Sequence, residues 1–177
     1  MIGTAIFYHL VTILGDRGVS EAQAAGCFTA FAAMMALWQF LGGLLADRVP
    51  ARRLVGAFGV SAAAGTGLFA LAETAPAAWA ALGLLGAAQG LLIAATGVLW
   101  PRFFGTRELG TIRGTVQMLG AAACATGPVI VAAARQHLGS FGGERPALWA
   151  FAALLAAAAL ASPLLKPPAG TAGARDV

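Results

Sequence analysis

Few residues in this sequence could do chemistry, because 59% of its 177 residues are hydrophobic and only 10% are charged. His9 is ionisable and lies within an apolar run, and such residues inside a membrane are candidates for contact with a solute or a proton. Three further apolar runs each contain an amide: Gln39, Gln89 and Gln117. In lipid an amide needs a hydrogen-bonding partner, which either a polar pathway or a neighbouring helix could supply.

The polar residues do not form the arrangement of an enzyme site. No serine–histidine pair lies in an obvious elbow, and no cluster of histidines and acids indicates a metal site. The two histidines, His9 and His137, lie in an apolar run and in an expected outer loop. Cys27 and Cys124 lie inside apolar runs, where we interpret them as packing residues. We therefore predict no enzyme activity, no catalytic residue, no metal site and no cofactor.

The apolar runs that carry these residues are long enough to cross a membrane. Runs of roughly 19–26 residues match about 30 Å of hydrocarbon at a rise of 1.5 Å per residue. The sequence therefore predicts an all-α membrane protein with six transmembrane helices. We expect them over residues 2–14, 22–46, 54–72, 77–100, 114–134 and 147–165. The first run covers only about 20 Å, so we expect a helix whose beginning is missing.

Two of the expected helices carry a stripe of small residues on one face. One stripe consists of Gly56, Gly59, Ala63 and Gly67, and the other consists of Gly83, Gly86, Gly90 and Gly97. In lipid such stripes let helix backbones approach closely, because packing rather than the hydrophobic effect drives helix association. The spacing therefore predicts tight contacts between helices at both stripes.

The distribution of charge indicates an orientation. The loops 47–53 and 101–113 and the segment after the last run hold eight of the 11 lysines and arginines, and the opposite side holds three. An excess of basic residues marks the cytoplasmic side, so we expect both termini in the cytoplasm and a bacterial-type inner (cell) membrane as the location. The net charge of +4 predicts no nucleic-acid partner, because the arginines lie in short loops. We expect one six-helix domain over 1–166 and a disordered cytoplasmic tail over 167–177.

Six helices with this loop arrangement resemble the carboxy-terminal half of a major facilitator superfamily transporter. The resemblance rests on the stretch Gly43-Leu44-Leu45-Ala46-Asp47-Arg48 and on the following pair Arg52-Arg53. These residues are similar to the loop signature of the superfamily, which reads Gly-x-Leu-Ala-Asp-Arg-x-Gly-Arg-Arg. Pro50 replaces the glycine of the signature, and Ala51 replaces the first of its paired basic residues.

A second loop is similar to that of monocarboxylate-porter-like and oxalate/formate-antiporter-like members of the superfamily. It reads Phe103-Phe104-Gly105-Thr106-Arg107-Glu108-Leu109-Gly110-Thr111-Ile112-Arg113-Gly114. Proton-linked monocarboxylate porters carry an acid and an arginine one turn apart in the second helix of this half, where this sequence has Met35 and Gln39. If the solute is an anion, its counter-charge must therefore come from His9 or from the absent amino-terminal half.

The resemblance implies that the first loop is a conformational latch. The carboxylate of Asp47 would meet a neighbouring helix N-terminus and an arginine. The residues assigned to this latch are Gly43, Asp47, Arg48, Arg52 and Arg53. Ordinary membrane topology and a helix stop are the alternative explanation of its basic residues. Arg107 and Arg113 would make a second gate contact, with anionic lipid headgroups as the alternative partner.

By the same resemblance, the three amides, Gln39, Gln89 and Gln117, lie in cavity-lining spans and would form a solute pathway together with His9. The helices would form two three-helix units of inverted topology, which rock in the lipid bilayer against an amino-terminal six-helix half or a second chain. The expected function is transport of a small organic solute by alternating access, with a carboxylate as the expected class and a proton as the candidate coupling ion. A non-transporting membrane scaffold or accessory subunit is the alternative.

Overall fold

The computed structural model describes residues 1–46, 48–104, 109–139 and 143–164, and within these ranges it contains helices and no strand. The elements are α1 (Ile2–Asp16), α2 (Glu21–Ala46), α3 (Ala51–Leu71), α4 (Ala75–Phe104), α5 (Leu109–Leu138), α6 (Arg145–Ala161) and the 3-10 helix η1 (Ser162–Leu164). This order confirms the all-helical class that the sequence predicts. The expected disordered tail, 167–177, lies outside the described residues.

Several charged residues lie inside helices rather than in the loops where hydropathy places them. Because α3 and α5 begin earlier than expected, Arg52, Arg53 and Arg113 lie in the first two turns of these helices. His137 lies in the last turn of α5 instead of in a loop. The physical reason is that backbone hydrogen bonding continues beyond the apolar run, where long charged side chains can still reach water.

Helix length separates the elements into two groups. Four described helices contain segments that are long and apolar enough to cross a membrane, and these segments lie in α2, α3, α4 and α5. α1 and α6 have 15 and 17 residues. Their lengths are therefore about 22 and 26 Å, which is less than the roughly 30 Å of a hydrocarbon core. Six complete membrane crossings stay a prediction.

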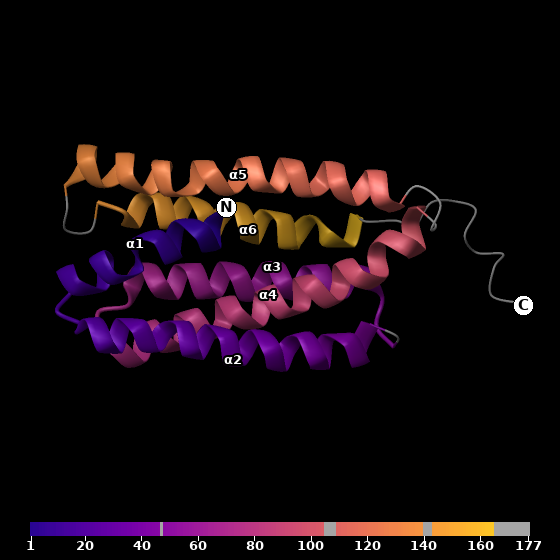
Figure 1. Cartoon of the computed structure of the whole chain (residues 1–177), viewed down its shortest axis with the longest axis horizontal. Coiled ribbons are helices and arrows are strands. Elements are labelled where there is room, and N and C mark those ends of the chain that lie inside the picture. The colour runs from indigo at the N-terminus through magenta and orange to yellow at the C-terminus, as the bar shows by residue number, and fades with distance from the viewer. Residues whose placement is uncertain (47, 105–108, 140–142, 165–177) are drawn as a thin grey trace, which may run out of the picture.

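The helices lie side by side with their long axes in the same general direction (Figure 1). We call the end that carries Arg48, Arg52, Arg53 and Arg113 the basic end, and it lies to the right in Figure 1. At the opposite end α1, α3 and α5 finish and α2, α4 and α6 begin, and we call it the ion-pair end. The N-terminus lies between the two ends, because α1 extends over only part of the length of the bundle (Figure 1).

Glycines bring α2 against α4 and α3 against α6. A Cβ atom at Gly90 of α4 would lie 2.5 Å from the carbonyl oxygen of Met35 and 2.6 Å from the backbone nitrogen of Gln39, both in α2. A Cβ atom at Gly59 of α3 would lie 2.7 Å from the Cβ atom of Ala159 in α6. These contacts confirm that helices approach closely at the two glycine stripes.

The apolar core lies mainly towards the ion-pair end. The large side chains buried there come from α1, α3, α4 and α6 and include Ile6, Leu10, Leu14, Phe69, Leu82 and Leu148. α5 is covered much less: it buries Gly127 and Val131, and its residues 109–122 include no buried residue. α2 is also mostly uncovered. The outer faces of α2 and α5 are therefore available to lipid, to a solute or to another chain.

Candidate functional site

The four residues expected to line a solute pathway lie on four different helices. His9 lies on α1, and the amides lie on α2, α4 and α5 as Gln39, Gln89 and Gln117. The three amides are exposed, and His9 is half-buried. Within the described ranges, no hydrogen bond joins the side chain of Gln39, Gln89 or Gln117 to a neighbouring helix. The interhelical hydrogen bonds that are the alternative explanation of these amides are therefore not formed there. Their part in a pathway stays a prediction.

His9 links α1 to α5. Its Nε2 lies 3.1 Å from the backbone carbonyl oxygen of Pro128. Because a carbonyl oxygen only accepts hydrogen bonds, Nε2 must carry the hydrogen, and the neutral ring keeps its lone pair on Nδ1. The hydrogen-bond ladder of α5 is interrupted here, since Pro128 has no N–H to donate to the carbonyl of Cys124. The imidazole thus lies at an interruption of α5, with its Nδ1 unbonded to any described residue.

Gln39 and Gly43 line the same surface hollow on α2. This hollow is shallow and open, and one face of α2 lines it with Ala36, Gln39, Phe40, Gly43 and Leu44. Four of these five residues are apolar, so the amide of Gln39 supplies the polar side chain. A residue expected in the solute pathway and a residue expected in the latch therefore lie one turn apart on one surface.

Only part of the expected latch can be placed at the basic end. Asp47 and Arg107 lie outside the described residues. The side chains of four arginines are exposed there, namely those of Arg48, Arg52, Arg53 and Arg113. No ion pair joins these four arginines to another described residue. Their exposure leaves both the latch and the contact with lipid headgroups as predictions.

Pro50 fits the turn between α2 and α3. It immediately precedes α3 and has φ −56° and ψ 135°. The proline ring imposes a φ close to this value, so the turn does not need the conformational freedom of the glycine in the signature. The backbone N–H of Val49 donates to the carbonyl oxygen of Leu45 at 2.8 Å, and that of Arg53 donates to Pro50 at 2.9 Å. The departure from the signature is therefore compatible with a regular turn.

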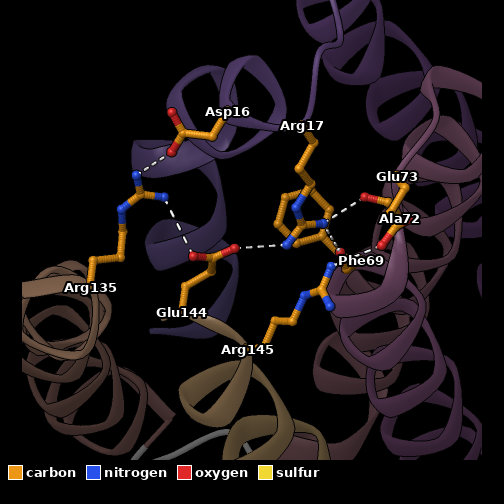
Figure 2. Close-up of polar contacts among 8 residues, drawn as sticks. All are labelled: Asp16, Arg17, Phe69, Ala72, Glu73, Arg135, Glu144 and Arg145. Atoms are coloured by element: carbon orange, nitrogen blue, oxygen red, sulfur yellow. Dashed lines mark hydrogen bonds and ion pairs between the residues drawn. The ribbon is translucent and has the colours of Figure 1, made fainter. Parts of the chain in front are cut away.

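Ion pairs at the ion-pair end join residues that are far apart in the sequence (Figure 2). Glu144 precedes α6 and is only 1% exposed, and its Oε1 lies 2.8 Å from Nη2 of Arg17. Its Oε2 lies 3.5 Å from Nη1 of Arg135. The other terminal nitrogen of Arg135 lies 2.5 Å from Oδ2 of Asp16. We call these four residues, Asp16, Arg17, Arg135 and Glu144, the Glu144 cluster.

Arg17 also binds the end of α3. Its Nη1 donates to the carbonyl oxygens of Phe69 at 2.9 Å and Ala72 at 2.6 Å (Figure 2). The last carbonyl groups of a helix have no partner within the helix, and a guanidinium can satisfy them. Beside the cluster, Arg145 and Glu73 form a more exposed pair at 3.1 Å. The described part of the ion-pair end thus combines a buried network with an exposed ion pair.

The charges of this network balance. The three cations are Arg17, Arg135 and Arg145, and the three anions are Asp16, Glu73 and Glu144. Each arginine already contacts a carboxylate, so these six residues offer no surplus cation to an anionic solute. In the sequence the three arginines indicate only the orientation. Two acid–arginine neighbours, Asp16-Arg17 and Glu144-Arg145, each lie at a helix end and were the signal that could have identified part of the network.

Comparison with known protein families adds evidence that the geometry alone does not supply. The family model described as Major Facilitator Superfamily matches residues 1–176 of the chain. No curated protein and no solved structure matches the chain. The matched range includes every helix of the described part, and the long apolar helices are consistent with it.

Proposed function

The chain belongs to the Major Facilitator Superfamily, whose members are membrane transporters rather than enzymes, and from this premise we propose that it forms half of a secondary transporter for a small organic solute. The observation that carries the proposal is the family match over residues 1–176, on a chain with long apolar helices. The helices act as two three-helix units of inverted topology and move by alternating access.

The uncovered helices support the idea of a partner. α2 and α5 leave most of their surfaces exposed, although both are apolar enough to cross a membrane. An amino-terminal six-helix half or a second chain would cover part of these surfaces and complete the solute pathway. Gln39 on α2 and Gln117 on α5 lie on exposed positions, where they would face this partner or the solute.

The hydrogen bond of His9 supports a carboxylate that binds together with a proton. Since Nε2 is occupied as a donor to Pro128, the neutral imidazole can offer a carboxylate only the lone pair of Nδ1, which repels it. The protonated imidazole offers an N–H at Nδ1 and a positive charge instead. A proton taken up by His9 would therefore supply the counter-charge that Met35 and Gln39 lack.

The charge distribution supports a location in the cell membrane. We place the basic end at the cytoplasmic side of a bacterial-type inner membrane, with six crossings and both termini in the cytoplasm, because exposed arginines gather at that end. Asp47 with Arg48, Arg52 and Arg53 would form the cytoplasmic latch. Anionic lipid headgroups remain the alternative partner of these arginines.

Uptake by proteoliposomes tests the proposal. The vesicles contain the chain alone or a tandem fusion of two copies, which keeps both copies in the same orientation. Radiolabelled L-lactate, formate and oxalate are supplied outside under an inward proton gradient. We expect saturable accumulation of at least one carboxylate, which stops when a protonophore dissipates the gradient. Accumulation of only neutral or cationic solutes would contradict the carboxylate, and no saturable movement of any solute by either sample would contradict a second copy of the chain as the partner that completes the pathway.

A further inference from the structure

Only one half of α5 is attached firmly to the bundle. Residues 109–122 of this helix include no buried residue, whereas Gly127 and Val131 are buried, the latter in a cluster with Ala5 and Phe151. α5 has α1 as its main neighbour and makes few contacts with α4 and α6. In contrast, α4 packs extensively on α2 and α3, and α3 packs extensively on α6. α5 is therefore peripheral to a tightly packed unit of α2, α3, α4 and α6.

The Glu144 cluster fastens α5 at the ion-pair end. Arg135 in the last turn of α5 contacts Asp16 at the end of α1 and Glu144 at the start of α6. Glu144 also contacts Arg17, which binds the last carbonyl groups of α3. A single carboxylate thus connects α5 with α1, α3 and α6 (Figure 2).

The side chains of the Glu144 cluster are largely buried, so each charge depends on its partner in the cluster. The side chains of Glu144, Arg17 and Arg135 are 1%, 9% and 13% exposed. Removing one member of a buried ion pair leaves the other charge without compensation, which is strongly unfavourable. Glu144 lies at the start of α6 and Arg135 in the last turn of α5, and Arg17 follows α1 and contacts the end of α3. The helix dipoles favour these signs of charge at these positions. The arrangement is therefore stable only while these helix ends lie together.

We propose that Glu144 is a positioning residue that anchors α5 to α1, α3 and α6 at the ion-pair end, and that α5 moves relative to the packed unit about this anchor. One fixed end and one uncovered half are what a pivoting helix requires. The proposal goes beyond the transport proposal, because it assigns a role to the end of the bundle that holds none of the expected pathway residues. It does not depend on which solute is carried.

Double electron–electron resonance on the full chain in lipid nanodiscs tests the anchor. One spin-label pair, Gln136→Cys with Thr74→Cys, reports the distance from α5 to the packed unit at the ion-pair end. A second pair, Val116→Cys with Ala57→Cys, reports the same separation towards the basic end. All four positions are exposed, so the labels replace no buried side chain. A narrow first distribution and a broader second distribution are expected when Cys27→Ala and Cys124→Ala have removed the native thiols and nothing else is altered.

Replacing Glu144 should broaden the distance distribution of the spin-label pair at the ion-pair end. In a background with Cys27→Ala and Cys124→Ala, Glu144→Gln should broaden the distribution at the ion-pair end about twofold, because a helix end without its contacts samples more positions. Glu73→Gln is the matched control, since it makes the same change in the neighbouring exposed pair. This control should leave both distributions unchanged.

Several outcomes would contradict the proposal that Glu144 anchors α5. If Glu144→Gln lowers the melting temperature but leaves the first distribution narrow, the residue stabilises the fold without positioning α5. Equal broadening by Glu73→Gln would show that the buried carboxylate is not special. A second distribution as narrow as the first would exclude the pivot. Arg135→Gln removes the link of α5 while Glu144 keeps Arg17, so it decides the question if Glu144→Gln does not fold.

Discussion

At the residue scale, the two histidines differ in their surroundings, and only His9 has the contacts on which the proposed proton-linked binding of a carboxylate depends. His9 is half-buried, and its Nε2 is held by the carbonyl of Pro128. His137 is exposed in the last turn of α5. Only for His9 does the structure determine which nitrogen of the neutral ring carries the hydrogen. A matched pair of substitutions can therefore separate proton-linked binding at His9 from a general effect of histidine charge.

Replacing His9 by glutamine should abolish pH-dependent binding of a carboxylate. The amide can still donate to Pro128, but it cannot take up a proton. We expect L-lactate to bind the chain in nanodiscs about tenfold more tightly at acidic than at alkaline pH, because the charged hydrogen bond forms only with the protonated imidazole. His9→Gln should remove this difference, and His137→Gln should keep it. Isothermal titration calorimetry measures both, and an unchanged pH dependence in His9→Gln would exclude the histidine as the proton site.

Replacing Asp47 by asparagine should impair the conformational cycle more than the folding. A neutral amide of the same size keeps hydrogen bonding but loses the charge that the latch requires. We expect uptake into proteoliposomes to fall at least about tenfold, as for a charge-assisted contact worth more than about 1.4 kcal/mol, with little change in melting temperature. Glu21→Gln, in the exposed first turn of α2, serves as the control. Normal uptake by Asp47→Asn would show that this residue is no latch.

At the scale of the elements, glycines decide how closely the helices approach. Gly90 and Gly97 belong to the same stripe of α4, but their surroundings differ. A Cβ atom at Gly90 would meet backbone atoms of α2 that cannot turn aside, whereas nothing lies within 4 Å of a Cβ atom at Gly97. A methyl group added at Gly90 would therefore push α4 away from α2, whereas one added at Gly97 would meet no atom of α2.

Gly90→Ala should destabilise the bundle, and Gly97→Ala should not. Overpacking of this kind costs about 1–3 kcal/mol, because the backbones of α2 and α4 must move apart. At Gly97 the added methyl group finds open space, so we expect a change within about 0.5 kcal/mol. Unfolding in mixed micelles, followed by tryptophan fluorescence, gives the free energies of unfolding. Equal stability of the two variants would mean that α2 and α4 do not pack through this stripe.

At the scale of the whole molecule, the two ends of the bundle differ in how their charges are satisfied. Described arginines at the basic end are exposed and have no described ion-pair partner, whereas arginines at the ion-pair end contact carboxylates. Unneutralised basic residues near the ends of membrane helices favour the cytoplasmic side. The structure therefore makes the orientation testable with one residue at each end.

Cysteine accessibility should place the basic end in the cytoplasm. In a background without Cys27 and Cys124, Arg52→Cys should react with a membrane-impermeant maleimide only in inside-out vesicles. Thr74→Cys, between α3 and α4 at the other end, should react only in right-side-out vesicles. Both positions are exposed, so differences in reaction reflect the membrane barrier rather than burial. The reverse pattern would invert the proposed orientation.

The sequence by itself determined the helical class, the approximate position of each helix, the close approach at both glycine stripes and the family. These properties depend on the length and composition of single apolar runs and on short motifs, which are local along the chain. The polar residues of the expected pathway were also found from the sequence, because an amide or an imidazole in an apolar run is conspicuous. Their roles stay predictions.

Only the tertiary structure decided which of the polar groups meet. Arg17 and Glu144 are 127 positions apart, and His9 and Pro128 are 119 positions apart, so no local pattern brings them together. Whether an arginine near a helix end faces water or a buried carboxylate depends on which other helix ends lie beside it. For the same reason the hydrogen-bonded nitrogen of His9 and the anchor of α5 became visible only in the packed bundle.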